Sequence, residues 1–500
     1  MSRILYYSAC SIAVPHIGVI IDDILSAKER GDEIYWCYCR GAISSCFTNR
    51  DGYPNICHFC HSMYQRFVKK YGDKVNVIPI NKEDFTPSNS KIPDWTLENV
   101  EQINSVVYRD VYIGTSILSF YYMVTRDLDM GNIQTFKSCV SPLISEICHF
   151  VDYVYDLIEE IKPDEIISFN GRLYENRMFY DIANALGIPY TALDVVGGHV
   201  EPYKKVRYKG GLPHSIGLNT AMIENLWKVS PLTDQEKTKI ASSFFQRRRN
   251  GELVADVAVY TTAQRQGLLP ENFDQSKRNI AIFNSSFDEK AALGGEWVQG
   301  KLFSNDYDAI EYMLQNTSQQ IHYYLRIHPN LKGVSHRDHL ELYNLSKYEN
   351  ITIIPPESEI STYSLMDACE KTVTFGSSTG VEATFWGKPS ILLGRSLYEN
   401  LDVCYKPIRK EELTSLIDNH LEPKNKTGAL KIAYYLLDRD YRVEKTNIDI
   451  DVKYKKLRWH YRFASYLKIG GSQLLYQMAY IYYYIILTKF GKAKMRFPRS

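Results

Sequence analysis

The sequence of 500 residues has no run of about 18 apolar residues, so no ordinary transmembrane helix is expected. Its 59 lysines and arginines almost balance its 58 aspartates and glutamates. The resulting net charge of +1 argues against nucleic acid as the main partner. No internal repeat or low-complexity segment is present. What remains is a globular composition, with a hydrophobic fraction of 45% and a charged fraction of 23%.

The length is too great for one ordinary hydrophobic core, so two or three domains are expected. Strand-like and helix-like patterns alternate in both halves of the chain, which predicts parallel, doubly wound sheets. The predicted strands cover residues 4–7, 33–39, 165–169, 190–195, 279–283, 321–326, 351–354, 371–375 and 390–393. The predicted division is an N-terminal Rossmann-like domain (1–218), a helical connector (219–275), a C-terminal Rossmann-like domain (276–425) and a helical tail (426–500).

The connector carries the basic cluster Arg247-Arg248-Arg249, which we interpret as a solvated helix face. The tail combines an aromatic run at 480–487 with lysines and arginines on both sides. It is too short to span a bilayer, and two interpretations are equally favoured. The tail packs as a terminal helix on the N-terminal domain, or it lies at an anionic membrane surface.

Two short motifs in the C-terminal half each follow a predicted strand. Arg326-Ile327-His328-Pro329-Asn330 comes after one strand, and Gly376-Ser377-Ser378-Thr379-Gly380 comes after another and before a helix. Open α/β sheets bind ligands at this edge, where the carboxyl ends of their strands lie. The residues offered there are a guanidinium, a ring N–H, hydroxyls and flexible backbone, at Arg326, His328, Pro329, Gly376, Ser377, Ser378, Thr379 and Gly380.

These side chains suit a phosphate ester, because arginine binds phosphate in a bidentate manner and a helix N-terminus attracts anions. Glu382, one turn into the helix, is a candidate for a ribose or sugar hydroxyl. Ser285 and Ser286 follow the first strand of the same domain and are candidate donor ligands or helix caps. The alternative for the second motif is a surface turn with a capping serine. Two such motifs in one domain favour the phosphate site.

The order of these motifs, together with Gly387-Lys388-Pro389, resembles bacterial capsular-polysaccharide glycosyltransferases of the GT-B fold over residues 160–405 and more weakly over the first 60. The His-Pro and Ser-Ser pairs are similar to those of bacterial sialyltransferases and Kdo transferases. The resemblance implies that His328, Ser377 and Ser378 hold the donor phosphate and slightly favours a CMP-sugar. It also implies that the C-terminal domain (276–425) binds the nucleotide donor, that the N-terminal domain (1–218) binds the acceptor, and that no metal or other cofactor is required for transfer. No convincing Asp-x-Asp motif is present, since Asp127-Leu128-Asp129 lies in a polar stretch that does not follow a strand.

An inverting transfer needs a general base to take the proton of the acceptor hydroxyl. Asp194, which follows a strand and precedes two glycines, is the first candidate, and His16 and His199 are the others. The alternative for each is a loop residue with ordinary hydrogen bonds. Asn170 and Arg172 also follow a strand and are candidate acceptor or phosphate ligands.

Five cysteines and two histidines lie within a short N-terminal stretch. In a cytoplasmic chain such a group indicates free thiols or a metal site. Cys46, Cys57 and Cys60, with Cys37 as a fourth ligand, are candidates for a structural zinc ion, and an iron–sulfur cluster is a less favoured alternative. Their spacing matches no single zinc motif, and buried free cysteine is the alternative.

The sequence thus predicts a cytoplasmic glycosyltransferase, peripheral on the inner membrane if its tail binds lipid. It would move a sugar from a nucleotide-sugar donor to a surface glycan (capsule, lipopolysaccharide O-chain or similar) or a lipid-linked glycan. A teichoic-acid-type transferase of polyol phosphate from a CDP-polyol, a nucleotide-sugar 2-epimerase and a non-catalytic assembly scaffold remain alternatives.

Overall fold

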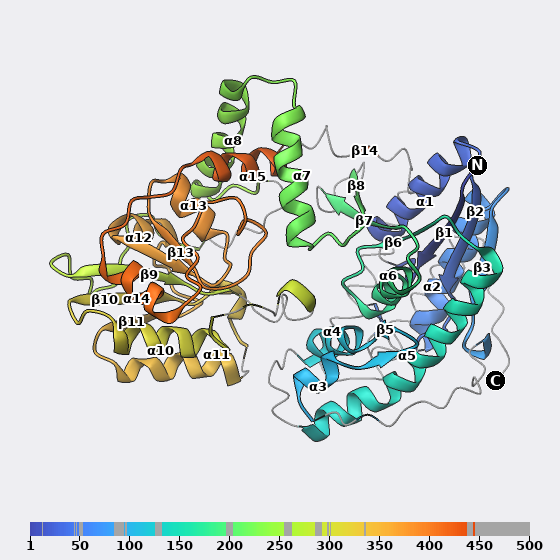
Figure 1. Cartoon of the computed structure of the whole chain (residues 1–500), viewed down its shortest axis with the longest axis horizontal. Coiled ribbons are helices and arrows are strands. Elements are labelled where there is room, and N and C mark those ends of the chain that lie inside the picture. The colour runs from blue at the N-terminus through green and yellow to red at the C-terminus, as the bar shows by residue number, and fades with distance from the viewer. Residues whose placement is uncertain are drawn as a thin grey trace, which may run out of the picture.

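The computed structural model describes residues 1–84, 95, 98–125, 133–196, 204–254, 263–285, 293–334, 337–437 and 444–445, apart from positions 13, 45, 47, 50–53, 298, 299 and 301. Two sheets form two separate lobes, and helices that follow the first sheet in the chain lie between them (Figure 1). Of the predicted tail (426–500), only residues 426–437 and 444–445 are described, and the Asp127 motif, Ser286 and His199 lie outside the described residues.

The N-terminal lobe is built on a seven-stranded sheet with the order β14-β8-β7-β6-β1-β2-β3. Its parallel strands are β1 (Arg3–Ser8), β2 (Glu33–Cys39), β3 (Asn76–Ile80), β6 (Glu165–Phe169) and β7 (Tyr190–Val196). Two antiparallel strands extend one edge, β8 (Lys204–Lys209) and β14 (Glu444–Lys445). Alternation along each buried strand sends side chains to both faces, so both faces need a cover of helices.

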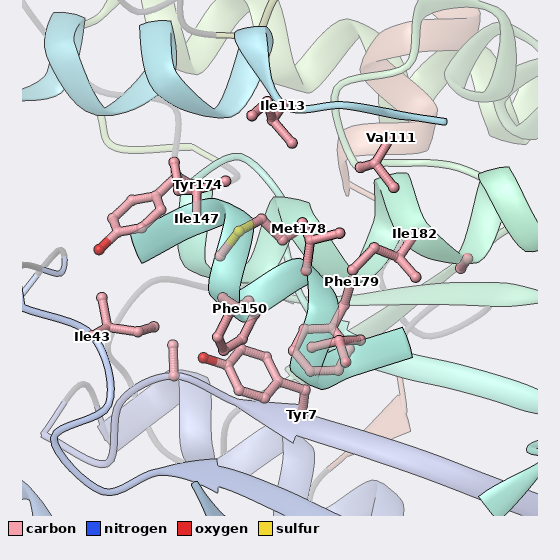
Figure 2. Close-up of a cluster of buried hydrophobic side chains, with 14 of the residues drawn as sticks. Tyr7, Ile43, Val111, Ile113, Ile147, Phe150, Tyr174, Met178, Phe179 and Ile182 are labelled. Atoms are coloured by element: carbon pink, nitrogen blue, oxygen red, sulfur yellow. The ribbon is translucent and has the colours of Figure 1, made fainter. Parts of the chain in front are cut away.

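One face of this sheet packs on α1 (Val14–Glu29) and α2 (Pro54–Tyr71). The other packs on α4 (Gly114–Thr125), α5 (Ile133–Ile161) and α6 (Tyr174–Leu186). Figure 2 shows the second core, where Tyr7 of β1 stacks on Phe179 of α6 with ring centroids 4.0 Å apart. Phe150 of α5 meets Phe179 edge-on at 5.7 Å, so aromatic pairs tie the sheet to two helices. The short α3 (Val100–Asn104) lies beside α4, and the hairpin of β4 (Val107–Tyr108) and β5 (Val111–Tyr112) contacts α6 through β5.

The C-terminal lobe contains a five-stranded parallel sheet with the order β11-β10-β9-β12-β13. The strands are β9 (Arg278–Phe283), β10 (Ile321–Arg326), β11 (Ile351–Ile354), β12 (Lys371–Thr374) and β13 (Ser390–Leu392). Helices α10 (Asp306–Asn316) and α14 (Lys410–Asp418) contribute to the core on one face. Helices α12 (Thr362–Ala368) and α13 (Thr379–Phe385) contribute to the other, and the short α11 (Arg337–Glu341) precedes β11.

Helices α7 (Ile216–Val229), α8 (Asp234–Arg249) and α15 (Thr427–Leu437) form a third cluster, which also packs on α13. A capping box at Thr233 and Glu236 starts α8. The two doubly wound Rossmann-like domains of the predicted GT-B fold are therefore confirmed. No helix within the described part of the chain is both long and apolar enough to cross a bilayer.

Candidate functional site

Three loops meet at the carboxyl ends of the central strands of the C-terminal lobe. Strand β9 lies between β10 and β12, so the loop at Asn284 lies between the loops that carry His328 and Ser377. A cavity of about 60 Å³ opens there. It is lined by Arg248, Gln264, Phe283, Asn284, Arg326, His328, Pro329, Thr362, Tyr363, Ser377, Ser378, Thr379 and Glu382. The two sequence motifs are therefore brought together, as the strand pattern predicted.

Arg326 is the last residue of β10 and is only 3% exposed. Its guanidinium donates to the backbone oxygens of Pro355 and Ser358, the latter at 3.0 Å, while its Nε has no hydrogen-bond partner. Burial lowers the pKa of Arg326 to about 10, attraction to Glu357 opposes this only in part, and no acidic side chain among the described residues forms an ion pair with Arg326. A buried guanidinium with so little compensation is costly in a free protein and is a strong site for an anion.

His328 lies directly above the sheet and its orientation is fixed from two sides. Its backbone N–H donates to Oδ1 of Asn284 at 2.8 Å, and its Nδ1 accepts from the backbone N–H of Asn330 at 3.2 Å. Pro329 begins the short 3-10 turn that this contact caps. Since Nδ1 is an acceptor, the neutral ring carries its proton on Nε2, as a donor to a ligand oxygen requires. Asn284 was missed in the sequence, although it directly follows a buried strand.

The Gly376–Gly380 loop is held tightly against the sheet. Gly376 has a φ of +97°, a region that favours glycine. A Cβ at Gly380 would lie 2.5 Å from the hydroxyl of Tyr398, whose O–H donates to the backbone oxygen of Ser377. The hydroxyl of Thr379 is buried and has no hydrogen-bond partner. Helix α13 has only seven residues, so the side chains of this loop matter more than a helix dipole.

Arg248 enters the same cavity from the C-terminal turn of α8. Its side chain is 11% exposed and pairs with Glu382, with Nη2 and Oε1 3.2 Å apart. Ser378 and Tyr363 also donate to the Glu382 carboxylate, the serine at 2.9 Å. Burial lowers the pKa of Arg248, but attraction to Glu382 outweighs this and leaves it raised. The prediction of a solvated helix face is therefore wrong for Arg248, because α8 packs on α13 and α15.

Glu382 is 1% exposed, and both its oxygens accept hydrogen bonds from protein groups. Its position fits a group that holds Arg248 and Ser378 in place. Its predicted contact with a ribose or sugar hydroxyl stays a prediction.

Unpartnered polar atoms gather around this cavity. Nε of Arg326, Nη1 of Arg248 and Oγ1 of Thr379 are all buried and lack a hydrogen-bond partner within the described chain. Buried polar groups in proteins are almost always hydrogen-bonded, so a cluster of exceptions needs an explanation. Two cationic groups and a hydroxyl that need partners are the complement of a phosphate group.

A second cavity of about 850 Å³ adjoins the first, and Gln264 and Tyr363 line both. It contains side-chain amides, hydroxyls and an arginine, and its remaining lining residues are Arg249, Asn250, Gly251, Gln266, Gly267, Leu269, Ser361, Ser364, Asp367 and Ala368. Arg249 pairs with Asp367 and lies over the ring of Trp386 at 4.6 Å. The first cavity therefore continues into a polar space large enough for a nucleoside.

On the N-terminal lobe, Asp194 lies near the carboxyl end of β7, and Asn170 directly follows the neighbouring strand β6. Nδ2 of Asn170 donates to Oδ2 of Asp194 at 3.0 Å, and the backbone N–H of Val195 donates to Oδ1 at 2.8 Å. Burial raises the pKa of Asp194 to about 6, although both hydrogen bonds lower it. Such a carboxylate is ionised at neutral pH yet basic enough to take a proton. His214, which the sequence did not single out, contacts Asn170 at 3.2 Å.

The other predicted site residues are placed as follows. His16 stacks on Phe169 with ring centroids 3.9 Å apart, at the same sheet edge as Asn170. The backbone N–H of Arg172 donates to Oδ1 of Asn170. The hydroxyl of Ser285 donates to the backbone oxygen of Phe375 and so ties the loop after β9 to the end of β12. The roles of His16, Arg172 and Ser285 in binding or catalysis stay predictions.

The four predicted zinc ligands are not assembled into one site. Cys37 is buried in the core under α4–α6, whereas Cys60 packs with the core under α1 and α2, on the opposite face of the sheet. The hydroxyl of Thr48 is hydrogen-bonded to the thiols of both Cys46 and Cys10, and the thiol of Cys57 accepts a hydrogen bond from Nδ2 of Asn49. Within the described residues, no three His, Cys, Asp or Glu side chains are placed to hold a metal ion. A structural zinc ion at this group stays a prediction.

No protein-family model matches the sequence, and no curated protein matches it significantly. Among solved structures, a β-Kdo 2,4 transferase, KpsC of Thermosulfurimonas dismutans, is 15% identical and aligns with 54% of this chain and 79% of its own at a TM-score of 0.35. The UDP-GlcNAc 2-epimerase of Neisseria meningitidis is 11% identical, with coverages of 87% and 99% and a TM-score of 0.26. Anabaena Alr3699/HepE, solved with UDP and glucose, is 11% identical, with coverages of 88% and 97% and a TM-score of 0.24. Likenesses this remote do not transfer a function, so function rests on the side chains of the site.

Proposed function

We propose that the protein is a glycosyltransferase that binds the phosphate of a nucleotide-sugar donor in the C-terminal cavity. The observation that carries the proposal is Arg326, a guanidinium 3% exposed that pairs with no acidic side chain of the described residues, at the carboxyl edge of a parallel sheet. Arg248, the ring of His328 and the hydroxyl of Thr379 surround the same small cavity. The adjoining polar cavity supports a nucleotide over free phosphate.

In the proposed reaction, Asp194 takes the proton of an acceptor hydroxyl. The acceptor oxygen then bonds to the anomeric carbon of the donor, and the bond from that carbon to the phosphate oxygen breaks with its electron pair. Arg326 and Arg248 stabilise the charge that grows on the leaving phosphate, as cationic side chains do in dry sites. With two guanidiniums there, we propose that no metal ion is needed at the phosphates.

The proposed acceptor is a surface glycan. CMP-activated sugars are the first donors to test, because the His328-Pro329 and Ser377-Ser378 pairs resemble those of enzymes that use CMP-sugars. The test is a thermal-shift series of the purified protein with CMP, CDP, UDP, GDP and inorganic phosphate. A ligand that binds the folded state raises the melting temperature. We expect one nucleotide to stabilise the wild type and not the Arg326→Met variant.

A matched control is Arg265→Met, because Arg265 is an exposed arginine that pairs with Glu359. Its nucleotide response should equal that of the wild type. If no nucleotide shifts the wild type, or if Arg326→Met responds equally, the phosphate assignment is wrong. A response to CDP with transfer from a CDP-polyol would identify a polyol-phosphate transferase instead.

A further inference from the structure

Asn170 connects Asp194 to a residue from a different part of the chain. Its Nδ2 donates to Asp194, so its Oδ1 is the acceptor end of the amide. Two donors meet that oxygen, the backbone N–H of Arg172 at 3.0 Å and Nε2 of His214 at 3.2 Å. Since Oδ1 can only accept, His214 must carry a proton on Nε2. The three side chains form one directed chain of hydrogen bonds, from His214 through Asn170 to Asp194.

The backbone of Asn170 shows that this arrangement is imposed by the fold. Asn170 has a φ of +56°, a conformation that few non-glycine residues adopt. The next residue, Gly171, has a φ of +71°, and a Cβ there would lie 2.5 Å from Leu212. Leu212 and His214 belong to the same loop before α7. The loop therefore packs tightly on the turn at the end of β6 and places the imidazole against the Asn170 amide.

His214 is itself anchored by the other lobe. Nε1 of Trp297, from the loop after β9, donates to the backbone oxygen of His214 at 2.8 Å. Beside it, Glu296 accepts from the backbone N–H of Ile216, the first residue of α7. Among the described residues, the charged groups that act on the imidazole are Arg172 and Arg177. Burial and the two arginines lower the pKa of His214 to about 3, so the ring stays neutral and keeps its role as a donor.

We propose that His214 is a positioning residue, whose Nε2–H fixes the Asn170 amide so that the amide orients the Asp194 carboxylate toward an acceptor hydroxyl. The catalytic part of this inference rests on the proposed function, while the hydrogen-bond chain stands by itself. His214 neither gives nor takes a proton in the reaction. Its contribution resembles that of a third group that orients a catalytic base.

Two substitutions separate this role from plain packing. His214→Gln places an amide N–H near the position of Nε2 and has no titrating ring, so it should preserve the chain. His214→Phe fills the space without a donor and should release the Asn170 oxygen. In His214→Phe the backbone N–H of Arg172 still donates to the Asn170 oxygen, so we expect the amide to lose its fixed orientation only in part.

The first measurement is the titration of the Asp194 carboxyl by NMR on protein labelled with 13C at aspartate Cγ, with Asp194→Asn to assign its signal. The apparent pKa should be near 6 in the wild type and in His214→Gln. In His214→Phe it should rise by about one pH unit, because a poorly fixed amide donates less well to the charged carboxylate. An equal titration in all three proteins would overturn the proposal.

The second measurement is turnover of the nucleotide sugar chosen by the thermal-shift series, with water as the acceptor and nucleotide release as the readout. The kcat of His214→Phe at pH 7 should fall about 10-fold with an unchanged KM, and His214→Gln should match the wild type. A loss in His214→Gln as large as in His214→Phe would show that the ring acts by its own chemistry and would also overturn the proposal. If His214→Phe shifts the titration of the Asp194 carboxyl but the wild type binds no nucleotide, the proposed function is wrong and the hydrogen-bond chain is still supported.

Discussion

Replacing Asp194 with asparagine should make the folded protein more stable above pH 6. A buried carboxyl whose pKa is raised from 3.8 to about 6 destabilises the folded state once it ionises there. The group has no effect when it is protonated in both states, at low pH. As the pH rises through 3.8 the unfolded chain gains the ionised form first, so the folded state loses relative stability until the pH passes 6.

The magnitude follows from the two pKa values. One pKa unit corresponds to about 1.4 kcal/mol, so the full penalty at pH 8 is about 3 kcal/mol. At pH 4.5 only about 1 kcal/mol of it has developed. The stability gap between Asp194→Asn and the wild type should therefore grow by about 2 kcal/mol between these pH values. Comparing two pH values removes the pH-independent cost of placing an amide beside Asn170.

The assay is urea unfolding of both proteins at pH 4.5, 6 and 8, followed by tryptophan fluorescence in the transition of the N-terminal lobe. Asp156→Asn is a matched control, because Asp156 is an exposed carboxylate on α5 in the same lobe. It should show the same small difference at each pH. A gap for Asp194→Asn that is constant with pH, or that shrinks as the pH rises, would refute the assignment of Asp194 as a buried base.

Further substitutions test the C-terminal lobe. Arg326→Met should weaken binding of the stabilising nucleotide by about 30-fold or more in titration calorimetry, because a desolvated charge contact is lost, and an unchanged Kd would exclude Arg326 as a phosphate ligand. Gly380→Ala should lower the free energy of unfolding by about 1–3 kcal/mol, because the new Cβ would collide with the hydroxyl of Tyr398. An unchanged urea midpoint would show that the loop at Gly380 does not pack this closely on Tyr398. Lys371→Met should lower the free energy of unfolding by about 3 kcal/mol, because the fully buried Nζ donates to three backbone carbonyls at the end of α14. A decrease of less than about 1 kcal/mol would show that water can replace the ammonium group at these carbonyls.

Neutralising Arg248 should separate affinity from stability. Arg248→Met leaves the buried carboxylate of Glu382 without its cation, so both nucleotide affinity and the free energy of unfolding should fall. The double variant Arg248→Met, Glu382→Gln should recover stability but not affinity. Measuring melting temperature and nucleotide Kd for both proteins checks this, and recovery of affinity in the double variant would show that Arg248 does not contact the phosphate.

The elements nearest the site were predictable because their signals are local. The strand Ile321–Arg326 and the helix Tyr174–Leu186 match the predicted limits, since a run of buried residues or an apolar repeat closed by Gly187 needs no distant partner to be recognised. The positions of the Arg326 and Ser377 motifs at strand ends were predictable for the same reason. Each is a short string of small and hydrogen-bonding residues directly after a strand.

The residues that sequence reasoning missed act across long separations in the chain. Arg248 lies 134 positions before Glu382, and His214 lies 44 positions after Asn170. Nothing near Arg248 distinguishes it from Arg247 on the same helix, which is about half exposed. The direction in which α8 packs on α13 decides which arginine enters the cavity.

The sequence by itself determined the alternation of strands and helices in both halves of the chain and the placement of the Arg326 and Ser377 motifs directly after strands, because these patterns are local. Only the tertiary structure decided which charges are buried. The opposite faces of one sheet separate Cys37 from Cys60, and the packing of α8 and of the loop before α7 brings Arg248 and His214 to their partners. Burial and pairing depend on contacts between segments far apart in the chain, and these contacts set the pKa values of Asp194 and Arg326.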